Sequence, residues 1–242
     1  MAREIKDFNR LELKYRVRHD TIAPFVEALG PYLVPDENNG PDGGYPIFSI
    51  YADSPELDCF WEKIEGLKYR RKVRFRRYGQ SDEVWLEIKQ RIDRTLQKRR
   101  IRWPLERVHE VFFDDAGLRE DLLQEPYDRV LGEILFLWRH YDLRPTMGTS
   151  YQRRAYFAAN ESDLRITFDT RVQFHPTDLR LDTKSEPGKA MIAPDEAILE
   201  VKYNHTVPLW LCRHIAEFDL QMIRMSKYCT AVDKQYFGGE LT

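Results

Sequence analysis

The feature that most constrains the fold is a strict alternation of charged and apolar residues in several separate segments. The pattern Leu-Glu-apolar-Lys occurs three times, as LELK at 11–14, LEIK at 86–89 and LEVK at 199–202. Residues two apart in a β-strand share a face. Each copy therefore places a glutamate and a lysine on one face and apolar side chains on the other, which predicts a sheet with one charged face.

Further strands and several helices follow from the same kind of pattern. Alternating segments at 47–53, 70–78, 149–158 and 164–174 predict additional strands. We expect helices at 21–33, at 54–66 with Ser54 as its N-cap, within 104–142, and from 209 to about 226. The segment 180–196 is expected to be a mobile loop and is the best candidate for a lid.

The charged faces allow two architectures. In one, the sheet is open, its apolar face lies on the core and its charges lie in water. In the other, the sheet closes into a barrel whose interior is charged and whose apolar outer faces lie under helices. A barrel of about eight strands is just wide enough for side chains or one small ligand. Because the expected helices must bury their apolar stripes on something, they favour the barrel.

Composition restricts the classes of function. Lys+Arg 38 and Asp+Glu 40 nearly cancel among 242 residues, so the overall charge does not indicate a nucleic-acid partner. The three cysteines show no metal-binding spacing, which is typical of a reducing compartment. The longest apolar run, at 134–138, is far too short to cross a bilayer. We expect a cytoplasmic protein with no transmembrane segment of its own.

The charged interior of the expected barrel is suited to binding a polyanion. Charges enclosed without partners would be costly. A phosphate chain held by Arg and Lys, with a divalent cation on the carboxylates, would neutralise such an interior. Arginine in particular has a planar fork that fits phosphate oxygens.

The ordered set of motifs resembles the triphosphate tunnel metalloenzymes, or CYTH-like superfamily, and within it the VTC-domain polyphosphate polymerases. The resemblance runs along nearly the whole chain, and the ordered set is more specific than any single motif. It lies in the segments NRLELKY, FSIYAD, KVRFRRYG, VWLEIKQRID with QKRR, YQRRAY, LRITFDT, LEVKY and MSKYC. The superfamily's opening Glu-x-Glu-x-Lys has Arg10 in place of its first glutamate here, which favours the polymerase branch over a two-metal hydrolase.

The resemblance implies an α+β fold for residues 1–242 as a single domain: a closed eight-stranded antiparallel barrel covered by helices. It also implies a set of phosphate-gripping catalytic residues, namely Lys14, Arg74, Arg76, Lys89, Arg153, Arg165 and Lys227. Tyr51, Lys98 and Ser226 would contact substrate, and Glu200 would bind Mn²⁺ or Mg²⁺. The role of Glu12 stays open between a metal neighbour and an ion-pair partner, and Lys202 is expected to support an ion pair.

The implied reaction transfers the γ-phosphoryl group of ATP to a growing polyphosphate chain. The alternatives are hydrolysis of an inorganic or organic triphosphate in the same tunnel, and binding of a polyanion without turnover. Eukaryotic members of this branch are attached to membrane helices, so a membrane-protein partner is possible. The sequence leaves a monomer and a weak dimer equally open.

Overall fold

An antiparallel sheet dominates the computed structural model, which describes residues 11–41, 43–93, 95–114, 117–124, 127–160, 163–181 and 187–242. Within these residues the sheet has eleven strands in the order β11-β1-β10-β8-β7-β3-β4-β5-β6, with β2 paired to β7 and β9 to β8. The eight long strands are β1 (Leu11–Arg18), β3 (Tyr45–Asp53), β4 (Tyr69–Tyr78), β5 (Glu83–Ile92), β6 (Thr95–Pro104), β7 (Arg144–Ala158), β8 (Arg165–His175) and β10 (Glu196–Tyr203). The three short ones are β2 (Leu33–Pro35), β9 (Lys189–Ala190) and β11 (Gln221–Met222).

The predicted closure of the barrel is wrong. The sheet ends at β6 on one side and at β11 beside β1 on the other, and the described strands of the two ends do not pair. The physical reason is that the outer edge of β1 is already occupied. Residues Tyr15 and Arg16 pair with β11, and the Ile223 amide donates to the Lys14 carbonyl at 2.8 Å. A side-chain contact nevertheless joins the two sides of the sheet, because Lys89 of β5, the strand next to β6, lies 3.8 Å from Glu12 of β1.

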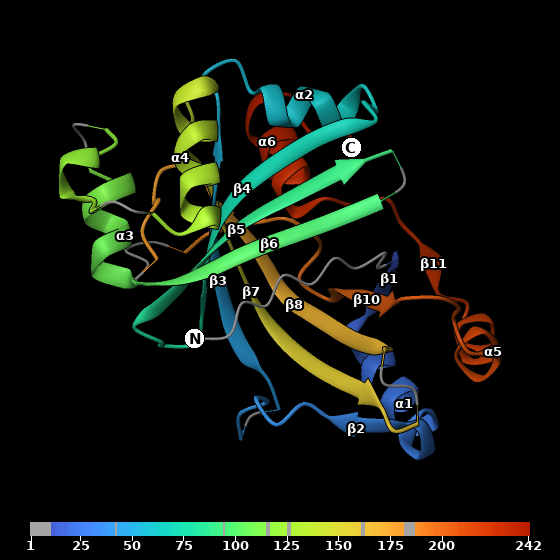
Figure 1. Cartoon of the computed structure of the whole chain (residues 1–242). Helices are drawn as coiled ribbons and strands as arrows, with labels where there is room; N and C mark the ends of the chain where they lie inside the picture. Colours follow the sequence, from blue (N-terminus) through green and yellow to red (C-terminus); the bar gives the residue numbers. More distant parts are fainter. Residues whose placement is uncertain are drawn as a thin grey trace.

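Helices cover the outer, apolar faces of the sheet, as the sequence predicts. Helices α3 (Leu105–Phe112) and α4 (Arg129–His140) pack on β4 and β5 through a core that includes Phe75, Leu86 and Ile88. Helices α1 (His19–Ala28) and α5 (Leu209–Glu217) cover β1, β8 and β10. Figure 1 shows α3 and α4 beside β4–β6, and α1 and α5 at the opposite side of the molecule. The apolar sides of the strands therefore face helices, and their charged sides face inward.

Two further helices close one end of this inward face. Helix α2 (Asp58–Ile64) and helix α6 (Lys227–Tyr236) pack together, joined where the Tyr228 hydroxyl donates to the Asp53 carboxylate. Asp53 also accepts from the amides of Cys59 (2.8 Å) and Phe60 (3.1 Å). The first amide of α2, that of Asp58, donates to Ser54 Oγ at 3.0 Å, but the helix begins only at Asp58 and its N-cap is Leu57, so the prediction of Ser54 as the N-cap is wrong.

The prediction of one helix from 209 to about 226 is also wrong. The chain forms α5, then β11, then the separate helix α6. Residues 182–186 of the expected loop 180–196 lie outside the described residues. A search of the described helices finds none long and apolar enough to span a membrane.

Candidate active site

The inward face of the sheet, together with the start of α6, encloses a strongly cationic space that we call the lumen. Among the described residues, the basic side chains that face it outnumber the carboxylates. The basic residues include Lys14, Lys72, Arg74, Arg76, Lys89, Lys98, Arg100, Arg153, Lys202 and Lys227, and the acidic ones include Glu12, Glu87, Asp169 and Glu200. Since buried charges are normally paired, such an excess of cations is typical of a site for an anion.

Glu200 is the centre of the first charge network. Its carboxylate lies 2.6 Å from Lys202, 2.9 Å from both Arg153 and Lys227, and 3.7 Å from Lys14. Burial alone would raise the pKa of Glu200, but these cations hold it well below its usual value. Glu200 is therefore ionised in the folded protein, and Lys202 has the ion-pairing role that its sequence position predicts.

Asp169 completes this network at the heart of the lumen. Arg153 donates to both of its oxygens at 2.6 and 2.7 Å, and Lys227 lies 2.6 Å from one of them. Burial would lower the pKa of Lys227, but Asp169 and Glu200 raise it. Lys227 is brought here because Ser226 caps α6 by accepting from the Cys229 amide at 3.4 Å, which sets the start of the helix.

A second network forms around Glu87 of β5. Arg74 donates to it through Nε at 2.8 Å, and Lys98 of β6 forms an ion pair with it. Arg74 also donates to the Tyr51 hydroxyl at 3.3 Å. Glu87 is only 1% exposed, so Arg74 and Lys98 are fixed in place around it.

Arg76 differs from the other buried arginines of the lumen. It is 6% exposed and its Nε donates to Ser49 Oγ at 3.0 Å, but among the described residues no carboxylate lies within ion-pair distance. Its guanidinium lies over the rings of Tyr78 and Tyr151, at 5.8 and 5.9 Å from their centres. A buried, permanently charged group without a counter-charge is suited to accept an anionic ligand.

Lys72 is a second such cation, and the sequence reasoning missed it. Its Nζ lies 2.8 Å from Cys229 Sγ and 4.8 Å from the centre of the Tyr228 ring, with no ion pair to any described carboxylate. The signal was available, because Lys72 is two residues before Arg74 on the same alternating strand.

The pKa values of two tyrosines show the sign of the electrostatic field in the lumen. Burial would raise the pKa of Tyr51, but Arg74 and Arg76 lower it to about 8. Burial would also raise the pKa of Tyr78, but Arg76 and Lys98 lower it to about 8. Both lowered pKa values show that the cations of the lumen stabilise a negative charge, which is the charge that a phosphate ligand would bring.

The structure does not bring every predicted site residue into these networks. Arg165 of β8 turns toward Asp36 at 2.8 Å and the Tyr45 hydroxyl at 3.1 Å, apart from the Glu200 cluster. Lys89 has only Glu12 as an ion-pair partner among the described residues, and its side chain is 43% exposed. The remaining predicted residues, Lys14, Tyr51, Arg74, Arg76, Lys98, Arg153, Glu200, Ser226 and Lys227, line or border the lumen.

The carboxylates of the lumen suit a metal that arrives with a phosphate ligand rather than a metal held by protein alone. In the described part of the chain no group of three or more His, Cys, Asp or Glu side chains is placed to hold an ion. Mg²⁺, however, is usually held by one or two carboxylates together with substrate phosphates. Glu200, which is ionised and lies at the centre of the site, fits that mode of binding.

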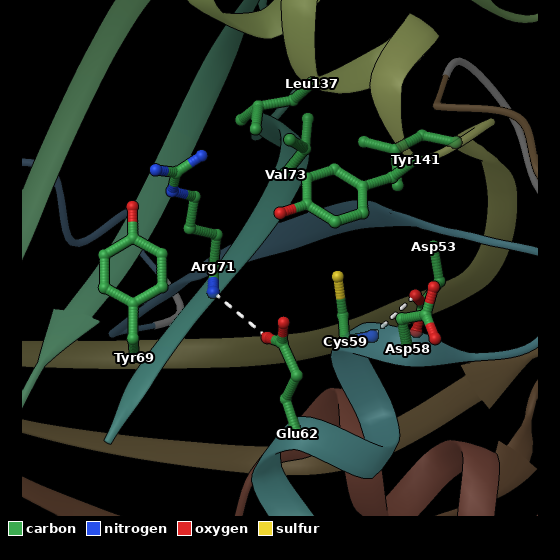
Figure 2. A pocket seen from close by; sticks show the side chains of 10 residues that line it. Asp53, Asp58, Cys59, Glu62, Tyr69, Arg71, Val73, Leu137 and Tyr141 are labelled. Atoms are coloured by element: carbon green, nitrogen blue, oxygen red, sulfur yellow. Dashed lines mark hydrogen bonds between the residues drawn. The ribbon is translucent and has the colours of Figure 1, made fainter. Parts of the chain in front are cut away.

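Two pockets lie apart from the predicted residues, none of which lines either of them. Figure 2 shows the smaller one, next to Glu62, Arg71 and the Cys59 thiol, with room of about 20 Å³. That is space for little more than one water molecule. The larger groove, of about 850 Å³, is lined by residues of β3, β7, β8 and 187–194, including the hydrogen-bonded pair Ser150 and His175.

The fold and the cationic lumen define an α+β protein whose antiparallel sheet turns a charged face inward. A solved candidate adenylate cyclase from Bacillus halodurans has the same fold, with a TM-score of 0.53, 11% identity and coverage of 98% of this chain and 100% of that chain. Another candidate adenylate cyclase, from Vibrio parahaemolyticus, has a TM-score of 0.47 and 11% identity, with 93% and 97% of the two chains covered.

The family is shown by the sequence. The model of the VTC domain matches residues 9–236, so the chain belongs to the VTC domain family. A curated relative, the vacuolar transporter chaperone complex subunit 4 of Trypanosoma brucei brucei (strain 927/4 GUTat10.1), is 27% identical over 212 residues. The match covers 72% of this chain but only 27% of that relative's length.

Proposed function

We propose that this chain transfers the γ-phosphoryl group of ATP to a growing polyphosphate chain within the lumen. The observation that carries the proposal is the excess of buried cations, and above all Arg76, which has no carboxylate partner among the described residues. Membership in the VTC domain family and the match to a vacuolar transporter chaperone subunit support the same substrate class.

The residues of the lumen suit phosphoryl transfer without a strong base. A terminal phosphate oxygen of the polyphosphate chain, already ionised, attacks the γ-phosphorus of ATP. The bond from that phosphorus to the bridging oxygen breaks, and ADP leaves with the bonding electrons. Such a reaction needs alignment and neutralisation of charge more than covalent chemistry. Arg74 and Arg76, adjacent on one strand face, can hold oxygens of successive phosphates.

The first network, around Glu200 and Asp169, would set where the negative charges of the substrate bind. Arg153 and Lys227 are held by Asp169 and Glu200, so they form a fixed positive wall. Lys14 joins this wall, because its Nζ lies 3.1 Å from Glu12 and 3.7 Å from Glu200 and donates to the Met225 carbonyl at 2.9 Å. Glu200 would bind Mn²⁺ or Mg²⁺ together with phosphate oxygens, and the cation would neutralise charge on the transferred group.

The chain would act beside other proteins. The T. brucei relative is named as a subunit of a complex. A membrane-protein partner is part of this proposal.

The testing experiment incubates the purified chain with ATP and Mn²⁺ or Mg²⁺, and follows ADP and acid-labile phosphate chains by gel electrophoresis. Chains together with ADP support the polymerase. ADP with free phosphate and no chains replaces it with a triphosphate hydrolase. Tight binding of polyphosphate without consumption of ATP at any metal concentration replaces it with a polyanion-binding module.

A further inference from the structure

We infer that Trp85 and Arg100 form a subsite for the nucleobase of a nucleoside triphosphate whose phosphates lie on Arg74 and Arg76. The inference rests on the proposed function, because it places the rest of the same substrate. It adds the recognition of an aromatic base, which the charge networks of the lumen do not provide.

The first step is the geometry of a preformed stack. The guanidinium carbon of Arg100 lies 4.0 Å from the centre of the Trp85 ring, and that of Arg102 lies 5.4 Å from it. All three side chains belong to the inward faces of β5 and β6, since Trp85 pairs with Arg102 and Glu87 pairs with Arg100. The stack therefore belongs to the lumen side of the sheet rather than to the apolar core under α3 and α4.

The second step is that Arg100 is available for a ligand. Arg102 is held by Glu83 at 3.1 Å, but no described carboxylate lies within ion-pair distance of Arg100. A guanidinium has two flat faces, and one of them already lies on the indole. The other face can receive a flat, electron-rich ring, because arginine planes and aromatic side chains both stack on nucleobases. Holding Arg100 against Trp85 in advance reduces the entropy lost when a base binds.

The third step is the position of the stack beside the phosphate site. Trp85 is the direct cross-strand neighbour of Arg76, and Glu87, which holds Arg74, is two residues further along β5. Side chains directly opposite each other on antiparallel strands have Cβ atoms about 5 Å apart. A triphosphate on Arg74 and Arg76 thus has its nucleoside end within reach of Trp85.

The fourth step is access from solvent. The stack is only half-buried, and β6 is the last strand on its side of the sheet in the described part of the chain. A base can reach Arg100 over this edge without moving the buried cluster around Glu200. Inorganic tripolyphosphate, which has no base, would use the phosphate site alone.

The test compares ATP with inorganic tripolyphosphate by isothermal titration calorimetry in Mg²⁺ buffer. The variants are Trp85→Ala, Trp85→Phe and, as a matched control, Trp210→Ala, whose ring stacks on Tyr32 at 4.5 Å on another part of the molecule. Trp85→Ala removes the ring that holds the Arg100 guanidinium in place for the base, so we expect it to weaken ATP binding about tenfold while tripolyphosphate binding changes less than about twofold. Trp85→Phe should keep most of the affinity for ATP, and Trp210→Ala should change neither ligand.

The outcomes separate this inference from the proposed function. If Trp85→Ala weakens both ligands equally, or neither, the nucleobase subsite is wrong while the phosphate site stands. If the unaltered chain binds neither ligand, the proposed function fails and the subsite fails with it. Circular dichroism of each variant identifies a loss of fold. If Trp85→Ala does not fold, Arg100→Ala, which removes the guanidinium on which the base would stack, gives the same comparison of ATP with tripolyphosphate.

Discussion

Arg76 donates a hydrogen bond to Ser49, whereas every other buried arginine of the lumen is paired with a carboxylate among the described residues. Its Nε lies 3.0 Å from the serine Oγ, between β4 and β3. A hydroxyl accepts the hydrogen bond but does not neutralise the charge. The positive field that results is visible in the lowered pKa values of Tyr51 and Tyr78.

Replacing Arg76 by alanine should weaken tripolyphosphate binding with little loss of stability. A hydrogen bond to a charged group is worth about 1.5–3 kcal/mol, which corresponds to a loss of affinity of about 10- to 100-fold. Because no described carboxylate depends on Arg76, its removal leaves no buried charge unpaired. Calorimetric titration and thermal unfolding measure the two effects. Unchanged affinity would remove Arg76 from the binding site.

Replacing Arg153 by alanine should, unlike Arg76→Ala, cause a large loss of stability. Arg153 is 4% exposed and bridges Asp169 and Glu200. Breaking a buried ion pair from one side costs about 3–5 kcal/mol, because the other charge is left buried without its partner. Urea unfolding followed by circular dichroism gives the free energy of unfolding.

The matched control for that variant is the next residue. Arg154 faces away from the lumen and donates to the Gly43 carbonyl at 2.6 Å. Arg154→Ala should change the free energy of unfolding by about 1 kcal/mol or less. Equal effects of the two substitutions would show that the buried network does not stabilise the fold.

Replacing Glu200 by glutamine should separate metal-dependent turnover from anion binding. The amide keeps the shape but removes the negative charge nearest to Lys202, Lys227 and Arg153. We expect turnover of ATP to be lost, while tripolyphosphate without metal binds as tightly as before or more tightly, because the lumen becomes more positive. Glu196→Gln, on the same strand at its partly exposed end, is the control. Full turnover by Glu200→Gln would exclude Glu200 as a metal ligand.

The affinity for tripolyphosphate should fall as pH rises through about 8. Tyr51 and Tyr78 lose their protons near that pH and place negative charge beside Arg74 and Arg76. Burial lowers the pKa of Lys202 to about 8 against the opposing effect of Glu200, so a positive charge is lost in the same range.

Linkage requires the reciprocal effect, in which a bound polyanion raises the pKa of both tyrosines. Absorbance at the tyrosinate band, recorded during a pH titration with and without tripolyphosphate, measures it. Tyr51→Phe should remove one of the two tyrosinate transitions near pH 8. A titration with every tyrosine near its ordinary pKa of about 10 would contradict the positive field.

The strands and their charged faces follow from the sequence because alternation is a local pattern. The structure confirms the strands that contain LELK, LEIK and LEVK, with Glu and Lys together on the inward face of each. The sequence could not predict that the sheet stays open, since this depends on β11, a strand of only two residues that shows no alternating pattern. Those two residues occupy the edge of β1 that a closed barrel would need.

Helix α6 was missed for a related reason. Residues 227–233 are all buried, including the polar Lys227, Thr230 and Asp233, so the polar residues of this helix do not mark a face turned toward solvent. Within the site, residue types and faces were predictable but partners were not. Arg165 turns to Asp36, which lies 129 residues earlier in the chain, and no spacing in the sequence indicates that contact.

The place of Lys227 in the chain gives the site an order of assembly. Every long strand precedes it, so Asp169 and Glu200 are synthesised before the lysine that joins them. A nascent chain emerges with its N-terminal part first. The strands that hold both acids can therefore be synthesised before α6, and the charge network around Asp169 and Glu200 is complete only when the first turn of α6 packs into the lumen.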